Sequence, residues 1–211
     1  MSSRKLPRTF YARETLTVAR ELLGMHLVHA GPHGKQVGRI VEVEAYRGPK
    51  DLAAHSSRGR TARTDVMFGP PGHAYVYLIY GFWNCLNIVT AAEGVPHAIL
   101  IRAIEPVAGI VATTHGPGLL CRALHIDRTL NRTDLTGGVL WVERPVQAEY
   151  RAPKIARSTR IGVDYAGDWA KKPWRFFDAG SAEVSTLTAA QRKRMRTKSD
   201  QAQAPVRSRE A

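Results

Sequence analysis

Carboxylate, imidazole and phenol side chains gather in two strand-like segments of the chain. Glu44 is followed by Tyr46 and then by His55, and further along runs Tyr75-Val76-Tyr77-Leu78-Ile79-Tyr80-Gly81. A lone acid can activate water, and aromatic rings can hold a flat heterocycle against their faces. The formal net charge of +13 favours a polyanion that carries such a heterocycle. Together these residues predict an enzyme that acts on a nucleic-acid base.

The positive charge belongs to the body of the chain as well as to its end. Residues 191–211 hold seven basic and two acidic residues, which leaves 24 basic and 16 acidic residues, or +8, in the first 190. Such a charge is typical of nucleic-acid-binding proteins. A basic protein from an arginine-rich proteome is the alternative, because charge alone says nothing about fold.

Composition also limits where the protein works. The two cysteines, Cys85 and Cys121, are too few for a zinc site of their own or for a disulfide framework. No apolar run approaches the roughly 18 residues that a membrane span requires, and no apolar segment follows the basic N-terminus as in a secretory signal. We therefore expect an intracellular protein, in the cytoplasm or nucleoid of a bacterium or the nucleus of a eukaryote.

Apolar periodicity and turn signals predict one α+β domain over residues 11–190, between an irregular arm, residues 1–10, and a basic, disordered tail, residues 191–211. Helices are expected at 12–23 and 118–124, with a frayed helix from 188. Strands are expected at 25–29, 36–46, 73–79, 82–89, 98–104 and 139–143, with short extended pieces at 155–158 and 175–177. Residues 47–71 are expected to form a long ordered loop. The sheet should be curved and largely antiparallel, flanked by helices, with a protruding hairpin.

The strand at 36–46 positions the candidate acid. Side chains alternate between the two faces of a strand, so Glu42, Glu44 and Tyr46 share one face and Val41 and Val43 lie on the other. If the apolar face packs on the core, the two acids and the tyrosine face a cleft or solvent. A half-exposed strand with solvated glutamates is the alternative, and on this pattern Glu42 rivals Glu44 as the reactive acid.

The loop after this strand carries Asp51, which we expect to order it, and His55. The neighbours of His55 are aromatic and cationic rather than further metal ligands, so no metal site is expected. Basic side chains that can reach DNA phosphates are Arg58, Arg60, Arg63 and Lys172.

Five blocks occur in order along the chain: Val41-Glu42-Val43-Glu44-Ala45-Tyr46-Arg47-Gly48-Pro49, Ala53-Ala54-His55-Ser56, Tyr75-Val76-Tyr77-Leu78-Ile79-Tyr80-Gly81, Cys85-Leu86-Asn87-Ile88 and Leu100-Ile101-Arg102-Ala103. Their order and approximate spacing resemble the alkyladenine (3-methyladenine) DNA glycosylase family. A closing segment is similar as well: Gly162-Val163, Ala166-Gly167-Asp168-Trp169-Ala170 and Lys172-Pro173. Several independent blocks are more specific than any single motif.

The resemblance implies a monofunctional hydrolase that flips a damaged purine out of duplex DNA and hydrolyses its N-glycosidic bond. Glu44 would activate the water, and Arg102 would help to hold it. The base would lie between Tyr46 and His55 on one side and Tyr77 on the other. Asn87 would exclude the exocyclic amino group of guanine. Tyr80, at the tip of the hairpin, would fill the space that the base leaves in the duplex.

The implied partner is double-stranded DNA with damaged purines: 3-methyladenine first, then 7-methylguanine, hypoxanthine and ethenoadenine as further candidates. No cofactor and no obligate protein partner are expected, and a monomer is typical of the family. Two other functions stay open at this point. One is a non-catalytic module that stacks unpaired bases on its tyrosines, and the other is an RNA-modifying enzyme.

Overall fold

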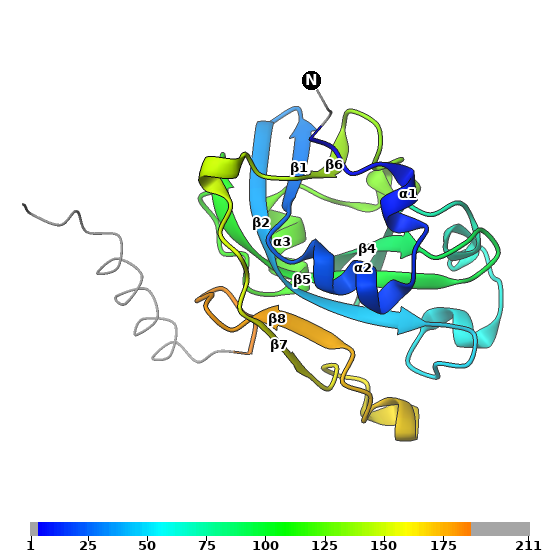
Figure 1. Cartoon of the computed structure of the whole chain (residues 1–211). Coiled ribbons are helices and arrows are strands. Elements are labelled where there is room, and N and C mark those ends of the chain that lie inside the picture. The colour runs from blue at the N-terminus through cyan, green and yellow to red at the C-terminus, as the bar shows by residue number, and fades with distance from the viewer. Residues whose placement is uncertain (1–3, 187–211) are drawn as a thin grey trace, which may run out of the picture.

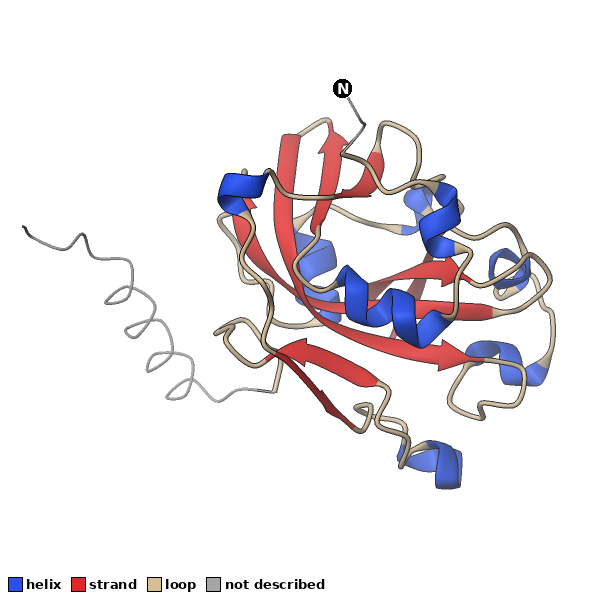
Figure 2. Ribbon diagram, in the orientation of Figure 1, coloured by secondary structure: helices blue, strands red, loops and turns tan. Residues whose placement is uncertain are grey.

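Antiparallel strands form a curled sheet that dominates the computed structural model, which describes residues 4–186 (Figures 1 and 2). Within this part of the chain the strands are β1 (His26–Gly31), β2 (Gly34–Arg47), β3 (Ala74–Ile79), β4 (Trp83–Thr90), β5 (His97–Ala108), β6 (Leu140–Glu143), β7 (Ile155–Ser158) and β8 (Arg175–Asp178). The sheet order is β3-β4-β5-β2-β1-β6, and β8 pairs with both β2 and β7. Every pairing is antiparallel. The predicted α+β class with a curved sheet is confirmed.

The helices are short and lie around the sheet. They are α1 (Arg8–Tyr11), α2 (Thr15–Leu22) and α3 (Pro117–Ala123), with 3₁₀ turns η1 (His55–Arg58), η2 (Asp65–Phe68), η3 (Arg128–Leu130), η4 (Gln147–Glu149) and η5 (Asp164–Trp169). The prediction of an irregular arm over residues 1–10 is wrong at its end. There α1 begins at Arg8, because Phe10 and Tyr11 are apolar anchors that bury themselves in the core.

The predicted helix at 12–23 is confirmed in a shorter form. Ala12 ends α1, and α2 begins only after Glu14, whose carboxylate accepts a hydrogen bond from the backbone N of Thr17 at 2.8 Å. This cap satisfies one of the N–H groups that the first helical turn leaves without a partner. The apolar stripe of α2, with Val18 and Leu22 buried, packs against the sheet.

Strand β2 is the element that carries the candidate acids, and it lies inside the sheet rather than at a surface. Glu44 is paired with Leu100 of β5 on one side and with Arg175 of β8 on the other. Register shifts occur beside Glu42, where the pairing with β5 is irregular. Val43 and Ala45 enter the core as expected, but Glu42 and Glu44 are also fully buried. A half-exposed strand with solvated glutamates is therefore the wrong description.

The segment between β2 and β3 is mostly loop, as predicted, with η1 and η2 inserted in it. After β3 the chain turns through Tyr80 and Gly81 into β4, which confirms the predicted hairpin. The predicted tail at 191–211 and the frayed helix from 188 lie outside the described residues. Within residues 4–186, no helix has the length and apolar character needed to cross a membrane.

Candidate active site

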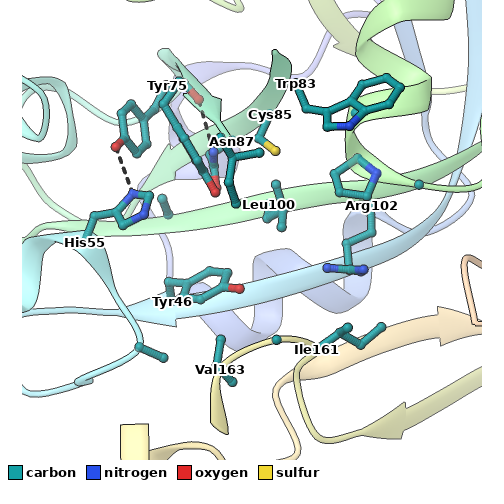
Figure 3. Close-up of a pocket in the computed structure, with 18 of the residues that line it drawn as sticks. Tyr46, His55, Tyr75, Trp83, Cys85, Asn87, Leu100, Arg102, Ile161 and Val163 are labelled. Carbon is teal, nitrogen blue, oxygen red and sulfur yellow. Dashed lines mark hydrogen bonds between the residues drawn. The ribbon is translucent and has the colours of Figure 1, made fainter. Parts of the chain in front are cut away.

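A cavity of about 380 Å³ opens between strands β2 to β5 and the loops beside them (Figure 3). Residues from distant parts of the sequence meet in its wall: Tyr46, His55, Tyr77, Asn87 and Arg102, with Tyr80 at the hairpin. The structure therefore brings together every base-pocket residue that the sequence suggested. It also adds Tyr75, Cys85, Leu100 and Ile161.

Glu44 lies directly behind this wall. Its side chain is 0% exposed, which corrects the expectation that it faces an open cleft. Its carboxylate accepts hydrogen bonds from the hydroxyl of Tyr46 (2.7 Å), the backbone N of Ile161 (2.8 Å) and Nη1 of Arg102 (3.4 Å). All three donor residues line the cavity. The acid is thus linked to the cavity by each of its partners.

Glu42 is surrounded more completely. It accepts from Nε of Arg102 (3.2 Å), Nε of Arg175 (2.6 Å), and both the backbone N (2.6 Å) and the hydroxyl (2.9 Å) of Ser185. An ionised carboxylate offers about four lone-pair sites. Three of the donors to Glu42 reach Oε1 and one reaches Oε2, so the number of donors does not separate the two acids. Their positions do, because neither Arg175 nor Ser185 lines the cavity, whereas all three donors to Glu44 line it. The geometry therefore favours Glu44 over Glu42 as the acid that can reach a water in the cavity.

The groups around Glu44 keep fixed protonation states. Burial opposes the charge of Arg102, but Glu44 and Glu42 outweigh it and raise the pKa of that arginine above its ordinary value. Burial, together with the charge of Glu44, raises the pKa of Tyr46 well above its usual range. Both groups consequently act as hydrogen-bond donors to the carboxylate at neutral pH.

His55 occupies the opposite end of the cavity and is a neutral ring. Burial lowers its pKa to about 4, and the charges of Arg63 and Arg58 contribute to the shift. Its Nε2 lies 3.4 Å from a guanidinium nitrogen of Arg63, and its Nδ1 lies 2.9 Å from the hydroxyl of Tyr75. Since a guanidinium can only donate, Nε2 accepts and Nδ1 carries the proton.

Three aromatic rings form a cluster at this end. The rings of His55 and Tyr77 meet edge to face with centroids 4.6 Å apart, and the ring of Tyr75 is 5.3 Å from that of Tyr77. Burial raises the pKa of both tyrosines and of the Cys85 thiol beside them. Asn87 is held by a hydrogen bond from its Nδ2 to the backbone O of Tyr75 (3.1 Å).

A buried ion pair, which the sequence analysis missed in part, anchors Tyr46. Arg160 and Asp51 are both fully buried and joined by two hydrogen bonds of 2.5 and 2.9 Å. The guanidinium of Arg160 lies 4.8 Å from the ring centroid of Tyr46 and donates to the backbone O of Ala45 (3.0 Å). Asp51 also accepts from the backbone N of Ala53, so its expected role in ordering the loop is confirmed. The only sequence signal for Arg160 is its place directly before the closing segment.

The hairpin tip presents aromatic side chains to solvent. Tyr80 is 80% exposed and Phe82 is 68% exposed. Tyr80 and Gly81 both have positive φ angles, 52° and 79°, as in the tight turns that favour hairpins. A tyrosine with a positive φ angle is uncommon and strained, and such strain often marks a functional position.

The four side chains predicted to contact phosphates are exposed, and none of them lines the cavity. Arg60 pairs with Asp65 at 2.7 Å, Arg63 lies over the ring of Tyr77, and Lys172 lies over the ring of Trp169. Arg58 is exposed at the end of η1. Their role toward DNA stays a prediction. In the described part of the chain, no cluster of three or more His, Cys, Asp or Glu side chains could hold a metal ion.

Comparison with known proteins agrees with this geometry. The family model for methylpurine-DNA glycosylases matches residues 9–182. The chain therefore belongs to the methylpurine-DNA glycosylase family, and it is a DNA glycosylase. The resemblance seen in its sequence blocks is confirmed.

Relatives are similar over nearly their whole length. A protein of Anaeromyxobacter sp. (strain Fw109-5) is 54% identical over 182 residues, which cover 86% of this chain and 92% of the relative. A protein of Legionella pneumophila (strain Corby) is 52% identical, with 86% and 98% covered. One of the archaeon Methanocella arvoryzae is 52% identical, with 85% and 95% covered. All three are provisionally named 3-methyladenine DNA glycosylases.

Asp51→Asn should destabilise the fold strongly, because it leaves the guanidinium of Arg160 buried without a counter-charge. We expect a loss of about 3–5 kcal/mol in the free energy of unfolding, measured by urea denaturation. Glu21→Gln is the matched control. It breaks the exposed pair between Arg13 and Glu21 and should cost less than about 1 kcal/mol. Equal losses in the two variants would contradict the anchoring role.

The pH dependence of stability should report the neutral state of His55. The folded protein keeps this ring unprotonated down to about pH 4, whereas an unfolded chain protonates it near pH 6.5. The unfolded state therefore binds more protons between these values, and stability falls as the pH is lowered through the window. Between pH 7 and pH 4.5, the free energy of unfolding of His55→Gln should fall by roughly 1 kcal/mol less than that of wild type, after allowance for solvent screening. Identical pH profiles for wild type and variant would refute this assignment.

Proposed function

We propose that the protein excises alkylated purines, 3-methyladenine first among them, from duplex DNA by hydrolysing the N-glycosidic bond with a water that Glu44 activates. The observation that carries the proposal is the position of Glu44, whose three hydrogen-bond donors all line one aromatic cavity. The family supplies the glycosylase activity, and the names of the relatives favour 3-methyladenine as a substrate.

The cavity suits a flat, electron-poor base. Tyr46 and Tyr77 contribute ring faces, and His55 contributes a neutral ring. Purines methylated at N3 or N7 within DNA are cationic, so phenol faces attract them by about 0.5–2 kcal/mol more than neutral bases. Methylation also weakens the bond to the sugar, because the departing base leaves as a neutral molecule. The pocket therefore needs to supply only modest selectivity for methylated over unmodified purines.

The hydrolysis requires a water at the sugar and a place for its proton. Oε2 of Glu44 is occupied by Tyr46 and Arg102, while Oε1 accepts one hydrogen bond, from the backbone N of Ile161. Because Ile161 lines the cavity, the remaining lone pair of Oε1 is the site for the water. The carboxylate would orient this water, accept its proton and stabilise positive charge on the sugar.

Access to a base in a duplex requires that it be rotated out of the stack, which costs a few kcal/mol. The hairpin between β3 and β4 offers Tyr80, which is exposed and adjoins the cavity. A side chain of this kind can enter the minor groove and fill the space that the base leaves. In this proposal the wedge and the pocket act together on the same nucleotide.

Replacement of the acid tests the chemistry. Glu44→Gln should lower the rate of base release about 10²–10⁴-fold, the usual contribution of a general base, while binding of lesion-containing duplex persists. The measurement is single-turnover incubation with methylated duplex DNA, followed by chromatography of the released bases. Glu93→Gln, an exposed acid on a turn, should match wild type. A base-stacking module without catalysis would release no base, whether as wild type or as either variant. Full activity of Glu44→Gln would reject the mechanism.

Replacement of the wedge tests the opening of the duplex. Tyr80→Ala should slow excision of a paired lesion about tenfold or more. Without the phenol ring in the vacated space, the free-energy cost of unstacking the base is no longer partly offset. It should have a smaller effect on the same lesion in single-stranded DNA, where no stack must be opened. Tyr150→Ala serves as control, since Tyr150 is exposed but lies away from the cavity. An equal loss on both substrates would contradict the wedge.

A further inference from the structure

Each of the two tyrosines that would stack on the base has a guanidinium behind it. The guanidinium of Arg160 lies 4.8 Å from the ring centroid of Tyr46, and that of Arg63 lies 4.9 Å from the ring centroid of Tyr77. Both tyrosines line the cavity, and neither arginine does. The two positive groups therefore lie behind the rings and act on a bound base across them.

The charges of these two arginines are balanced differently. Arg160 is neutralised by Asp51 through two hydrogen bonds. Arg63 lies on an exposed loop whose one nearby acid, Asp65, already pairs with Arg60 and with Arg132. Within residues 4–186, Arg63 itself takes part in no ion pair. Arg63 thus supplies an uncompensated positive charge next to the cavity.

This charge lies at a defined end of the cavity. In Figure 3, His55 and Arg102 are at opposite ends, and Tyr46 lies between them with its hydroxyl toward Arg102. Arg63 contacts His55, whereas Glu44 accepts hydrogen bonds from Tyr46 and Arg102. A carboxylate therefore marks one end of the base slot and a free guanidinium the other.

We propose that Arg63 assists the departure of the base electrostatically, acting through Tyr77 and His55, and that it thereby extends the enzyme to purines that carry no charge of their own. The inference rests on the proposed function. When the bond between C1′ and the base nitrogen breaks, both bonding electrons go to the base. The oxygen of the water bonds to C1′, and its proton goes to Glu44. The base becomes one unit more negative, and a fixed positive charge beside it favours that change.

The consequence differs between two classes of lesion. A cationic purine such as 7-methylguanine is repelled by Arg63 when it binds and is relieved of that repulsion when it leaves as a neutral molecule. The two effects cancel in the excision efficiency, which compares the transition state with free enzyme and free DNA. A neutral purine such as hypoxanthine or ethenoadenine leaves with negative charge unless an acid protonates it. In the described part of the cavity wall, Tyr46, Tyr75, Tyr77 and Cys85 have raised pKa values and the pKa of His55 is lowered, so none of them is a strong acid poised near neutral pH. The excision efficiency on neutral purines consequently depends on Arg63, and the efficiency on cationic purines does not.

The test compares Arg63→Gln with wild type on two duplexes that differ only in the lesion, 7-methylguanine or ethenoadenine. Single-turnover rates are measured against enzyme concentration, and the maximal rate divided by the half-saturating concentration gives the excision efficiency. Arg63→Gln should lower the efficiency on ethenoadenine about fivefold, as expected for a unit charge roughly 8 Å away at an effective dielectric constant near 40. The efficiency on 7-methylguanine should stay within about twofold by the same argument.

Two control variants separate charge from other roles of this side chain. Arg63→Lys keeps the charge and loses the flat guanidinium, so its ratio between the two lesions should stay near that of wild type. Arg60→Gln removes a neighbouring charge that already pairs with Asp65, and its ratio should also be unchanged. Binding of undamaged duplex is measured for all variants, because a phosphate contact would weaken every duplex alike.

The outcomes distinguish this inference from the proposed function. A wild type that releases no base from either duplex, and none from methylated DNA, rejects both. A wild type that releases 7-methylguanine but no ethenoadenine or hypoxanthine overturns the role of Arg63 and leaves the proposed function standing. An equal loss of efficiency on both lesions in Arg63→Gln also overturns it, because the side chain then acts through phosphates. If Arg63→Lys changes the ratio between the two lesions as much as Arg63→Gln does, the side chain acts through packing, and the inference is overturned as well.

Discussion

The buried pair between Asp51 and Arg160 holds the site together. It joins two loops, one after β2 and one before β8, that both contribute residues to the cavity wall. Arg160 also donates to the backbone O atoms of Ala45 and Trp169 and packs over Tyr46. The next residue in the chain, Ile161, donates its N–H to Glu44. The orientation of the Tyr46 ring and that of the Glu44 carboxylate therefore depend on one guanidinium.

The acids beneath the cavity are held by arginines in equal number. Arg102, Arg160 and Arg175 contact Glu42, Glu44 and Asp51. Such buried pairs add little net stability compared with well-packed apolar side chains, but removal of one partner is costly. Their value is positional, since they fix each carboxylate in a single orientation. Arg63, which takes part in no ion pair within residues 4–186, lies outside this set.

Much of this arrangement could be read from the sequence, and the limits have physical causes. Period-two alternation placed Glu42, Glu44 and Tyr46 on one face of β2, which the structure shares, because local sterics govern side-chain direction. It could not show that this face is buried, because the groups that enclose the two acids include Ile161, Arg175 and Ser185, more than a hundred residues later. Nor could it rank the two acids, since the donors that surround Glu42, Arg175 and Ser185, come from that same distant segment. The family resemblance, rather than any local pattern, selected Glu44. Arg160 escaped notice because a buried arginine has no periodic signal of its own.

Cys85 gives the cavity a property that matters for the cell in which it works. Its sulfur lies in the wall of the cavity (Figure 3), and the residue pairs with Tyr77 across the hairpin. Burial raises the pKa of the thiol. Thiolates, not thiols, are the form that attacks electrophiles. Alkylating reagents that methylate purines attack ionised cysteines preferentially, and here the thiol is held in its protonated form. The cavity wall of this DNA glycosylase therefore carries its cysteine in the less reactive form.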